Sequence, residues 1–211
     1  EDSIAKVATE YYKKHGPRRN YARALYYLGK SYYYIEEYDK AILEYSKAEK
    51  VAVGCDSLYL GMIYSGKSYT YNCNYNSSQE AYYAQKAYEI FSKLNISSYT
   101  RAALYRLAVS YHNNDEYENA LNVYNRIIDE SSDVDFVLLQ SLLGKAHTMI
   151  EIEDSDYFVI DNLFRKAHNE YHAEFEERDY WAWAYSLYKI GSNNEAEAIM
   201  NNIDVSEEYT A

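Results

Sequence analysis

Residues 24–51 read ALYYLGKSYYYIEEYDKAILEYSKAEKV, and this stretch decides the fold. Its apolar residues recur every three or four positions, which predicts two amphipathic helices joined near Glu36. Small residues, Gly29, Ala41 and Ala48, stand where two packed helices come closest. Helix axes in such a pair approach to about 8–10 Å, so larger side chains at both Gly29 and Ala41 would force the helices apart.

The composition extends this helical pattern to the whole chain. One proline and seven glycines in 211 residues leave few helix breakers, so we expect an almost wholly helical protein. Apolar residues make up 48%, but 29 tyrosines stand against five phenylalanines. Because a tyrosine hydroxyl can face water, this favours a thin, surface-rich fold. A first helix is predicted from Asp2 to Lys14, ended by Gly16 and Pro17.

Charge and segment patterns limit the class of partner and the compartment. A net charge of -12 argues against nucleic acid and anionic membranes as partners, because both require clustered cations. No apolar run reaches the roughly 18 residues of a membrane-spanning helix, and no signal segment opens the chain. Cys55 and Cys73 would lie roughly 27 Å apart along a helix, so we expect free thiols. Both a bacterial cytoplasm and a cell envelope fit these features.

The opening stretch resembles a repeat unit of the tetratricopeptide family, a helix-turn-helix unit of about 34 residues. The residues that carry the resemblance are Leu25, Leu28, Gly29, Tyr32, Ala41, Tyr45 and Ala48. A second copy is weaker, with two extra residues in its turn and Glu80 where the family prefers Ala. The resemblance implies an all-α, right-handed superhelix of antiparallel helix hairpins.

The repeats imply a single domain over residues 1–211. We expect the second helix of a partial repeat over 1–16, followed by repeats at about 22–55, 59–94, 101–134, 137–174 and 177–210. Their irregular spacing resembles the repeat regions of bacterial signalling and regulatory proteins. A repeat array needs polar outer faces at its ends. Because the apolar residues Met200 and Ile203 lie near the C-terminal end, we expect that further protein follows or that this end packs against another copy.

The family resemblance also implies a binding surface. The first helix of each hairpin would line a concave groove through its positions 2, 5, 9 and 12, and none of these 20 residues is acidic. Five are basic, against about two expected from composition, which favours a partner with acidic and apolar groups. The alternative is that the tyrosines simply fill the interior. The candidate groove residues are Arg23, Tyr26, Lys30, Tyr33, Ile63, Lys67, Tyr105, His112, Lys145, Arg178, Trp181 and Tyr185.

Catalytic and metal-binding patterns are weak. His168 and His172 have the i, i+4 spacing that can chelate zinc, but Glu170 falls on the wrong side for the zinc-protease pattern. The other interpretation is a pair of exposed histidines at a helix end. Gly-rich phosphate loops and nucleophile motifs are lacking, so we expect no catalytic residue, metal or cofactor, and keep an enzyme or metal protein as a remote alternative.

These features predict a non-catalytic scaffold that binds a protein or peptide in a groove. An alternative hypothesis is a sensor or regulatory segment of a larger bacterial signalling or transcription-regulating protein whose output domain is missing. A membrane span or DNA-binding helices after Ala211 in the full protein would support the alternative, and a chain end at Ala211 would contradict it.

Overall fold

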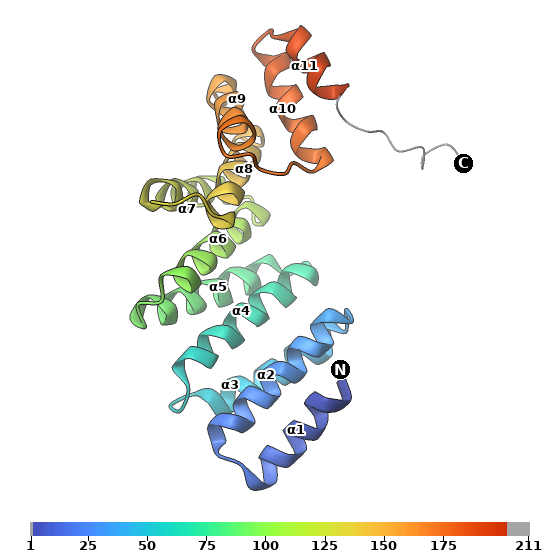
Figure 1. Ribbon diagram of the computed structural model, residues 1–211, viewed down its shortest axis with the longest axis vertical. Coiled ribbons are helices and arrows are strands. Elements are labelled where there is room, and N and C mark those ends of the chain that lie inside the picture. The colour runs from blue at the N-terminus through green and yellow to red at the C-terminus, as the bar shows by residue number, and fades with distance from the viewer. Residues whose placement is uncertain (1, 202–211) are drawn as a thin grey trace, which may run out of the picture. The chain divides into compact units, whose positions relative to one another are not determined.

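The computed structural model describes residues 2–201, and Figure 1 shows their arrangement. These residues form helices joined by short turns, and the described part of the chain contains no strand. The helices are α1 (Asp2–His15), α2 (Arg18–Tyr34), α3 (Tyr38–Ala52), α4 (Ser57–Cys73), α5 (Ser77–Lys93), α6 (Ser97–Asn113), α7 (Tyr117–Glu130), α8 (Phe136–Ile150), α9 (Tyr157–Arg165), a π-helical turn (Lys166–Glu170), α10 (Glu177–Lys189) and α11 (Asn193–Met200). The predicted all-α helical-repeat class is therefore confirmed.

The chain forms two compact units, Glu1–Glu116 and Tyr117–Ala211, called unit 1 and unit 2 below. Unit 1 contains α1 to α6, and unit 2 contains α7 to α11. The predicted single domain over 1–211 stays a prediction. The expected fifth repeat extends to 210, so its last residues, Ile203 among them, lie outside the described residues.

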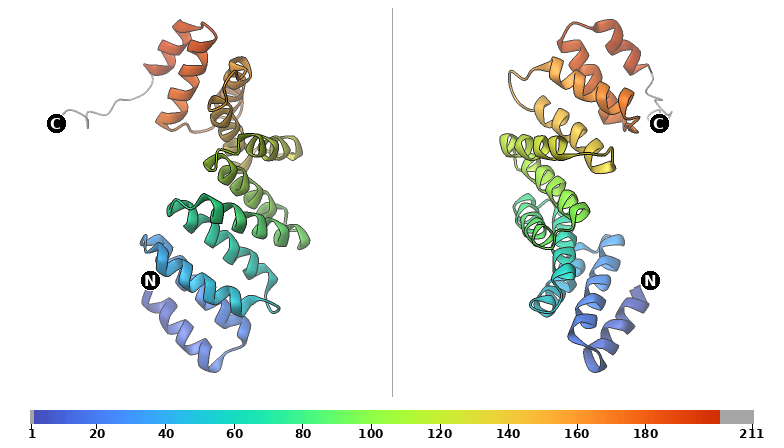
Figure 2. Two further views of the ribbon diagram at one scale, coloured as in Figure 1. Left: turned by 180° about the vertical axis from the view of Figure 1, so that it is seen from behind. Right: turned by 60° about the vertical axis from the view of Figure 1, so that its left-hand side comes forward.

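Unit 1 is a stack of helices in which each packs on the next in sequence, as Figures 1 and 2 show from three sides. Alanines at the closest approaches have no exposed surface, among them Ala41 and Ala48 of α3. The ring of Tyr45 is almost fully buried between α2 and α4, because a glycine on each of these helices leaves room for it. The core thus consists of small residues with a few large aromatic rings between them.

Unit 2 has its own core, around Phe164 and Trp183, to which α8, α9 and α10 all contribute. The indole Nε1–H of Trp183 donates to Asp161 at 2.7 Å, so its polar group is satisfied inside the core. His147 on α8 and Asp179 on α10 form a largely buried pair, 2.7 Å between Nε2 and Oδ1.

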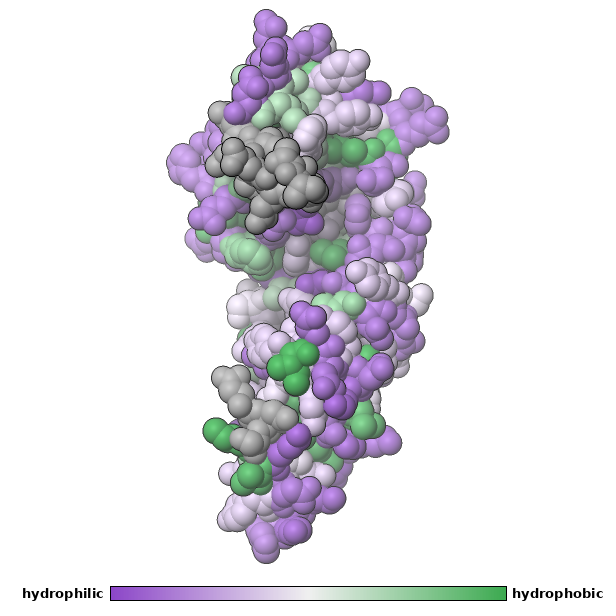
Figure 3. Space-filling model, turned by 90° about the vertical axis from the view of Figure 1, so that its right-hand side faces the viewer, coloured by the Kyte–Doolittle hydropathy of each residue, from purple (hydrophilic) through white to green (hydrophobic). Residues whose placement is uncertain are grey.

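Apolar groups are scattered over the drawn surface of the protein. On the face drawn in Figure 3, hydrophobic groups in green form small separate patches among hydrophilic ones. Exposed apolar residues include Ile4, Val7 and Ile35. Among residues 2–201, no helix combines the length and the apolar character that a membrane span requires. Cys55 and Cys73 are free, as predicted.

Candidate binding site

Three turns between consecutive helices define the register of the first repeats. The turns after α2, α4 and α6 each contain one residue with left-handed backbone: Glu36, Tyr75 and Asp115, with φ of 62°, 53° and 59°. These residues are 39 and 40 positions apart. Three residues separate the helices at each turn. The turns are therefore equal in length, and the expected two-residue insertion in the second turn is wrong.

This register changes which residues are equivalent along the chain. Counted back from the turns, Gly29 corresponds to Ser68 and Ala108, and not to Gly66. Gly66 is small for another reason, because a Cβ atom there would lie 2.8 Å from Cζ of Tyr45 in the preceding hairpin. Gly66 therefore makes room for a ring of the neighbouring hairpin and is not the small residue of its own repeat. The residues of α4 assigned to the groove must therefore shift by two positions.

A pocket of about 490 Å³ lies within unit 1, and we call it the α2–α6 pocket. This volume falls within the range of sites that hold small ligands or single anchoring side chains. Its wall combines aromatic rings with small residues that leave the space open. The lining residues are Tyr26, Lys30, Tyr33, Tyr34, Tyr45, Met62, Ser65, Gly66, Ser68, Tyr69, Ala84, Ala87, Phe91, Tyr99, Ala102, Ala103 and Arg106.

The pocket is electropositive inside an acidic protein. None of its lining residues is acidic, whereas Lys30 of α2 and Arg106 of α6 are basic. Burial, with smaller effects of neighbouring tyrosines, raises the pKa of Tyr26 to about 12. Burial and the hydrogen bond from Cys73 raise the pKa of Tyr33 to about 12 as well. Both hydroxyls thus stay neutral near pH 7, and the charge of the pocket wall is that of its two cations.

Arg106 is held in place by two neighbours. Its guanidinium carbon lies 3.9 Å from the ring centroid of Tyr69, and Nη1 donates to Oε1 of Glu80 at 3.3 Å. Burial by itself lowers the pKa of Arg106, but Tyr69 and Glu80 outweigh it and leave the pKa raised. The side chain is only 15% exposed and remains charged. A fixed positive charge therefore forms part of the pocket wall.

Three predicted groove residues, Tyr26, Lys30 and Tyr33, meet in this pocket. The ammonium of Lys30 lies 5.5 Å from the ring centroid of Tyr34, and within residues 2–201 it forms no ion pair. Arg23, by contrast, does not line the pocket. Its Nε donates to Asp56 at 2.9 Å, and its guanidinium packs on Tyr59, so it joins α2 to α4.

The expected placement of Ile63 and Lys67 on the open face is wrong. Ile63 has 0% exposed surface and belongs to the core of the first hairpin. Lys67 is 3% exposed, and its Nζ donates to Glu49 at 2.6 Å and to the hydroxyl of Tyr83 at 3.1 Å. The two-residue register error explains both results, because it moved buried positions of α4 onto the face that Met62, Ser65 and Tyr69 occupy.

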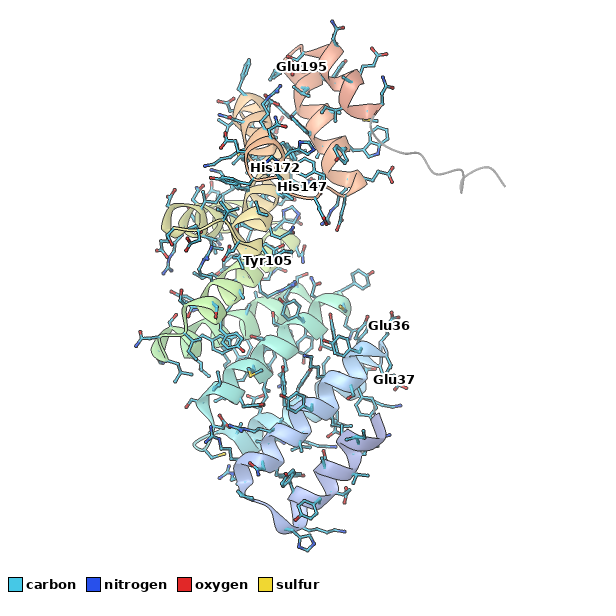
Figure 4. The ribbon with its side chains drawn as sticks, in the orientation of Figure 1. Glu36, Glu37, Tyr105, His147, His172 and Glu195 are labelled. Carbon is cyan, nitrogen blue, oxygen red and sulfur yellow. The ribbon has the colours of Figure 1, made fainter. Side chains whose placement is uncertain are left out.

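Tyr105 and His112 are half-buried on α6 outside the pocket, and Figure 4 labels the first of them. In unit 2, Lys145 is half-buried on α8. Arg178 is exposed on α10 and pairs with Glu176 at 3.0 Å. Their role in binding stays a prediction.

Trp181 and Tyr185 follow Arg178 on α10 and are exposed, 53% and 44%. The indole Nε1–H of Trp181 donates to Glu177, and Tyr185 packs on Tyr157 of α9. They therefore form an aromatic surface of unit 2. That this surface binds a partner stays a prediction.

The two histidines weighed as zinc ligands do not share a helix face. His168 lies in the π-helical turn and packs against Phe175 and Trp183. His172 follows that turn, with φ of 54°, and Figure 4 labels it. Residues 2–201 contain no group of three His, Cys, Asp or Glu side chains that could hold a metal ion.

Several pocket residues were missed from the sequence, above all Met62, Ser65, Tyr69 and Arg106. A signal for α4 was present, since hairpins with turns of equal length place these positions on the face that Tyr26, Lys30 and Tyr33 occupy in α2. Arg106 was not among the predicted groove residues. Its guanidinium pairs with Glu80, which stood out in the sequence only as a poor match.

Comparison with known proteins supports this architecture. Residues 23–50 and 102–133 match the family model described as tetratricopeptide repeat. No curated protein matches the chain. The two matched segments lie in α2–α3 and in α6–α7.

Solved structures with the same fold are distant in sequence. The apo form of RapI superimposes with a TM-score of 0.77 at 17% identity, over 95% of this chain and 57% of RapI. BtubC (BKLC) from P. vanneervenii gives 0.77 at 14%, over 95% and 87%. A STAND signal transduction ATPase with a tetratricopeptide repeat sensor, PH0952 from Pyrococcus horikoshii, gives 0.68 at 18%, over 94% of this chain and 29% of that one. The chain thus spans little more than half of RapI.

Proposed function

Because the chain carries a tetratricopeptide-type repeat array, we propose that it is a non-catalytic binding protein that holds a segment of a partner protein in the α2–α6 pocket. The observation that carries this proposal is a pocket of about 490 Å³ with two basic and no acidic lining residues, in a chain of net charge -12. Such a surface favours a partner with acidic groups and steers its approach.

The shape of the pocket supports an apolar anchor. Tyr26, Tyr99 and Phe91 supply rigid rings, while Ala102 and Gly66 leave space between them. Interfaces gain most of their affinity from a few large side chains seated in such pockets. We therefore propose that the partner inserts an aromatic or large aliphatic side chain here, with a carboxylate nearby.

A library selection tests this proposal. Random twelve-residue peptides are selected on the immobilised full chain, and the recovered sequences should be enriched in apolar residues flanked by Asp or Glu. Ser65→Trp fills the pocket and should abolish capture, whereas the matched variant Ser78→Trp places the same side chain on α5 outside the pocket lining. A selection without binders, or binders captured equally by Ser65→Trp, would contradict the proposal.

Charge reversal gives a second arm of the same test. Lys30→Glu should weaken capture about tenfold and reduce its salt dependence, because one of the two pocket cations is reversed. Lys93→Glu alters an exposed lysine of α5 outside the pocket and should leave capture unchanged. Circular dichroism checks that each variant keeps its helices.

A sensor or regulatory segment of a larger signalling protein is the second candidate. The supporting observation is that the chain spans only 29% of PH0952, whose tetratricopeptide repeat is described as a sensor. In that case the pocket would receive the signal and another domain would give the output. The full-length reading frame tests this candidate, since a protein that ends at Ala211 would contradict it.

A further inference from the structure

Helix α1 has one uncovered apolar side at the N-terminal end of unit 1. It packs on α2 and on no other helix among residues 2–201, and Figure 1 shows it as the outermost helix of this unit. Ile4, Val7 and Tyr11 are 76%, 69% and 58% exposed. Because they recur three and four residues apart, they form one apolar stripe along α1.

A groove of about 530 Å³ runs beside this stripe, between α1 and α2. Most of its lining is apolar or aromatic, and the charged group among the lining residues, the guanidinium of Arg23, is already bound to Asp56. The lining residues are Ile4, Ala5, Ala8 and Tyr12 of α1, and Asn20, Arg23, Ala24 and Tyr27 of α2. Because Ile4 belongs to both, the stripe and the groove form one surface, which we call the α1 face.

The next hairpin shows what kind of structure fits such a groove. Helix α2 packs on both α3 and α4, so it lies where these two helices meet. The equivalent place one hairpin earlier, against α1 and α2, holds no helix of residues 2–201. A helix that runs antiparallel to α1, as α2 runs antiparallel to α3, therefore fits the groove.

Helix α1 itself has the residue pattern of such a helix. In α2, two large apolar residues, one small residue and a tyrosine follow at intervals of three, one and three positions, and these are Leu25, Leu28, Gly29 and Tyr32. The same order and intervals recur in α1, as Ile4, Val7, Ala8 and Tyr11. The leucines of α2 are buried, and Gly29 lies against the ring of Tyr45 in α3. The exposed stripe of α1 thus matches the side through which α2 packs.

We propose that the α1 face binds a second copy of this chain, so that α1 of each copy lies in the groove between α1 and α2 of the other. Such a contact is isologous, because one surface supplies both the inserted helix and the groove. The two α1 helices run antiparallel about a two-fold axis. When Ile4 of one copy lies opposite Tyr11 of the other, the axis passes between Val7 and Ala8.

The distribution of charge favours this occupant. Unit 1 contains 15 Lys and Arg against 13 Asp and Glu, whereas unit 2 contains 6 against 20. The net charge of -12 therefore comes from unit 2, and two copies that meet through unit 1 bring their less charged units together.

The charges of α1 are also complementary in this arrangement. The antiparallel register brings Glu10 of one copy to within one residue position of Lys6 of the other, and the two-fold axis repeats this pair. Both side chains are exposed on α1. Because exposed ion pairs contribute little free energy, these pairs select the register and the apolar stripe supplies most of the affinity.

Sedimentation velocity of the full chain at about 1–200 µM tests the proposal. A reversible monomer–dimer equilibrium is expected in this range, since a face of two helices is smaller than a standard interface of about 800 Å² per partner. Val7→Glu should raise the dissociation constant about tenfold or more, because it places a charge next to the two-fold axis. Leu43→Glu changes an equally apolar, 54% exposed side chain of α3 and should leave the equilibrium unchanged.

Two results of this experiment would overturn the proposal. One is a dimer that Val7→Glu leaves intact. The other is a chain that stays monomeric at the highest concentration, which would leave the α1 face to a different occupant, such as a helix of another protein. Circular dichroism checks that both variants keep their helices.

Cross-linking tests the antiparallel arrangement. Ile4→Cys and Tyr11→Cys are prepared separately, each with Cys55→Ser and Cys73→Ser, and are treated with a short bismaleimide at a concentration that favours the dimer. A mixture of the two variants should give a covalent dimer that joins one to the other, whereas each variant alone should give much less. If each variant were linked to itself as well as to the other, the antiparallel contact would be wrong.

Discussion

The hairpins α2–α3 and α4–α5 have turns of equal length, but they differ in the side chain that lies where their two helices come closest. In the first, Ala41 closes the approach with a methyl group. In the second, Glu80 occupies the same place and reaches Arg106 of the next helix. A repeat array can therefore bury a charged group at a scaffold position when the following helix supplies its partner. Both hairpins and α6 line the pocket, and Glu80 of the second hairpin holds the charged side chain of Arg106 in its wall.

Moving the carboxylate to the first hairpin should destabilise the protein more than any other change considered below. Ala41→Glu would bury a charge where no following guanidinium is placed to receive it, and we expect a loss of about 4 kcal/mol or more in the free energy of unfolding. Urea denaturation followed by circular dichroism measures the loss. Ala41→Met is the control for volume and should cost about 1–3 kcal/mol. Equal losses for Glu and Met would show that position 41 tolerates a carboxylate.

The same comparison shows how much could be predicted from sequence. The helical-repeat fold could be predicted from four residues, Gly29, Ala41, Tyr45 and Ala48. Small residues that pack around a ring recur at regular spacings in the sequence. The register of α4 could not be obtained from small residues alone, since Gly66 responds to a ring in another hairpin. The contact between Gly66 and Tyr45 depends on how the two hairpins lie in space, and it does not recur at a fixed spacing in the sequence.

The candidate site was predictable only in part, for a related reason. Tyr26, Lys30 and Tyr33 lie in the hairpin with the clear register, and they line the pocket. Arg23 has the right position for the open face, yet the carboxylate of Asp56, 33 residues away, binds it. Ion pairs between helices depend on which side chains meet in space, and a single sequence does not show that.

The junctions that follow the two hairpins also differ in how the next helix begins. Asp56 caps α4 through the backbone N–H of Tyr59 and binds Arg19 and Arg23, whereas α6 begins after Ile96, which makes no side-chain cap. We expect Asp56→Ala to lower the free energy of unfolding by about 2 kcal/mol near pH 7, from the lost cap and the stranded arginines. The contribution of Arg19 is reduced by solvent, because that side chain is 55% exposed.

This loss should depend on pH. Burial raises the pKa of Asp56, but the hydrogen bonds from Arg19, Tyr59 and Arg23 outweigh it and leave the pKa lowered. The stabilisation is therefore present above the ordinary aspartate pKa of about 4 and is lost as the pH falls through the lower folded value. Wild type and Asp56→Ala should converge in acid. Asn76→Ala removes an uncharged cap from α5 and should show no such convergence.

The smallest expected effect concerns the ring shared by the two hairpins. A Cβ atom would lie 2.8 Å from the ring of Tyr45 at Gly29 and at Gly66, so glycines of α2 and α4 confine this ring from both sides. Gly66→Ala should cost about 1 kcal/mol, because overpacking of about 1–3 kcal/mol is offset in part by the better helix propensity of alanine. Urea denaturation measures it.

A double-mutant cycle tests whether Tyr45 is the cause. In a Tyr45→Val background the ring is gone, so Gly66→Ala should no longer destabilise the protein and the two changes should couple. Additive effects would mean that the second hairpin needs Gly66 for the packing of its own two helices, as the first hairpin is expected to need Gly29. Coupling would instead make Gly66 part of the first hairpin's packing, and the register of α4 would be set by the turn at Tyr75.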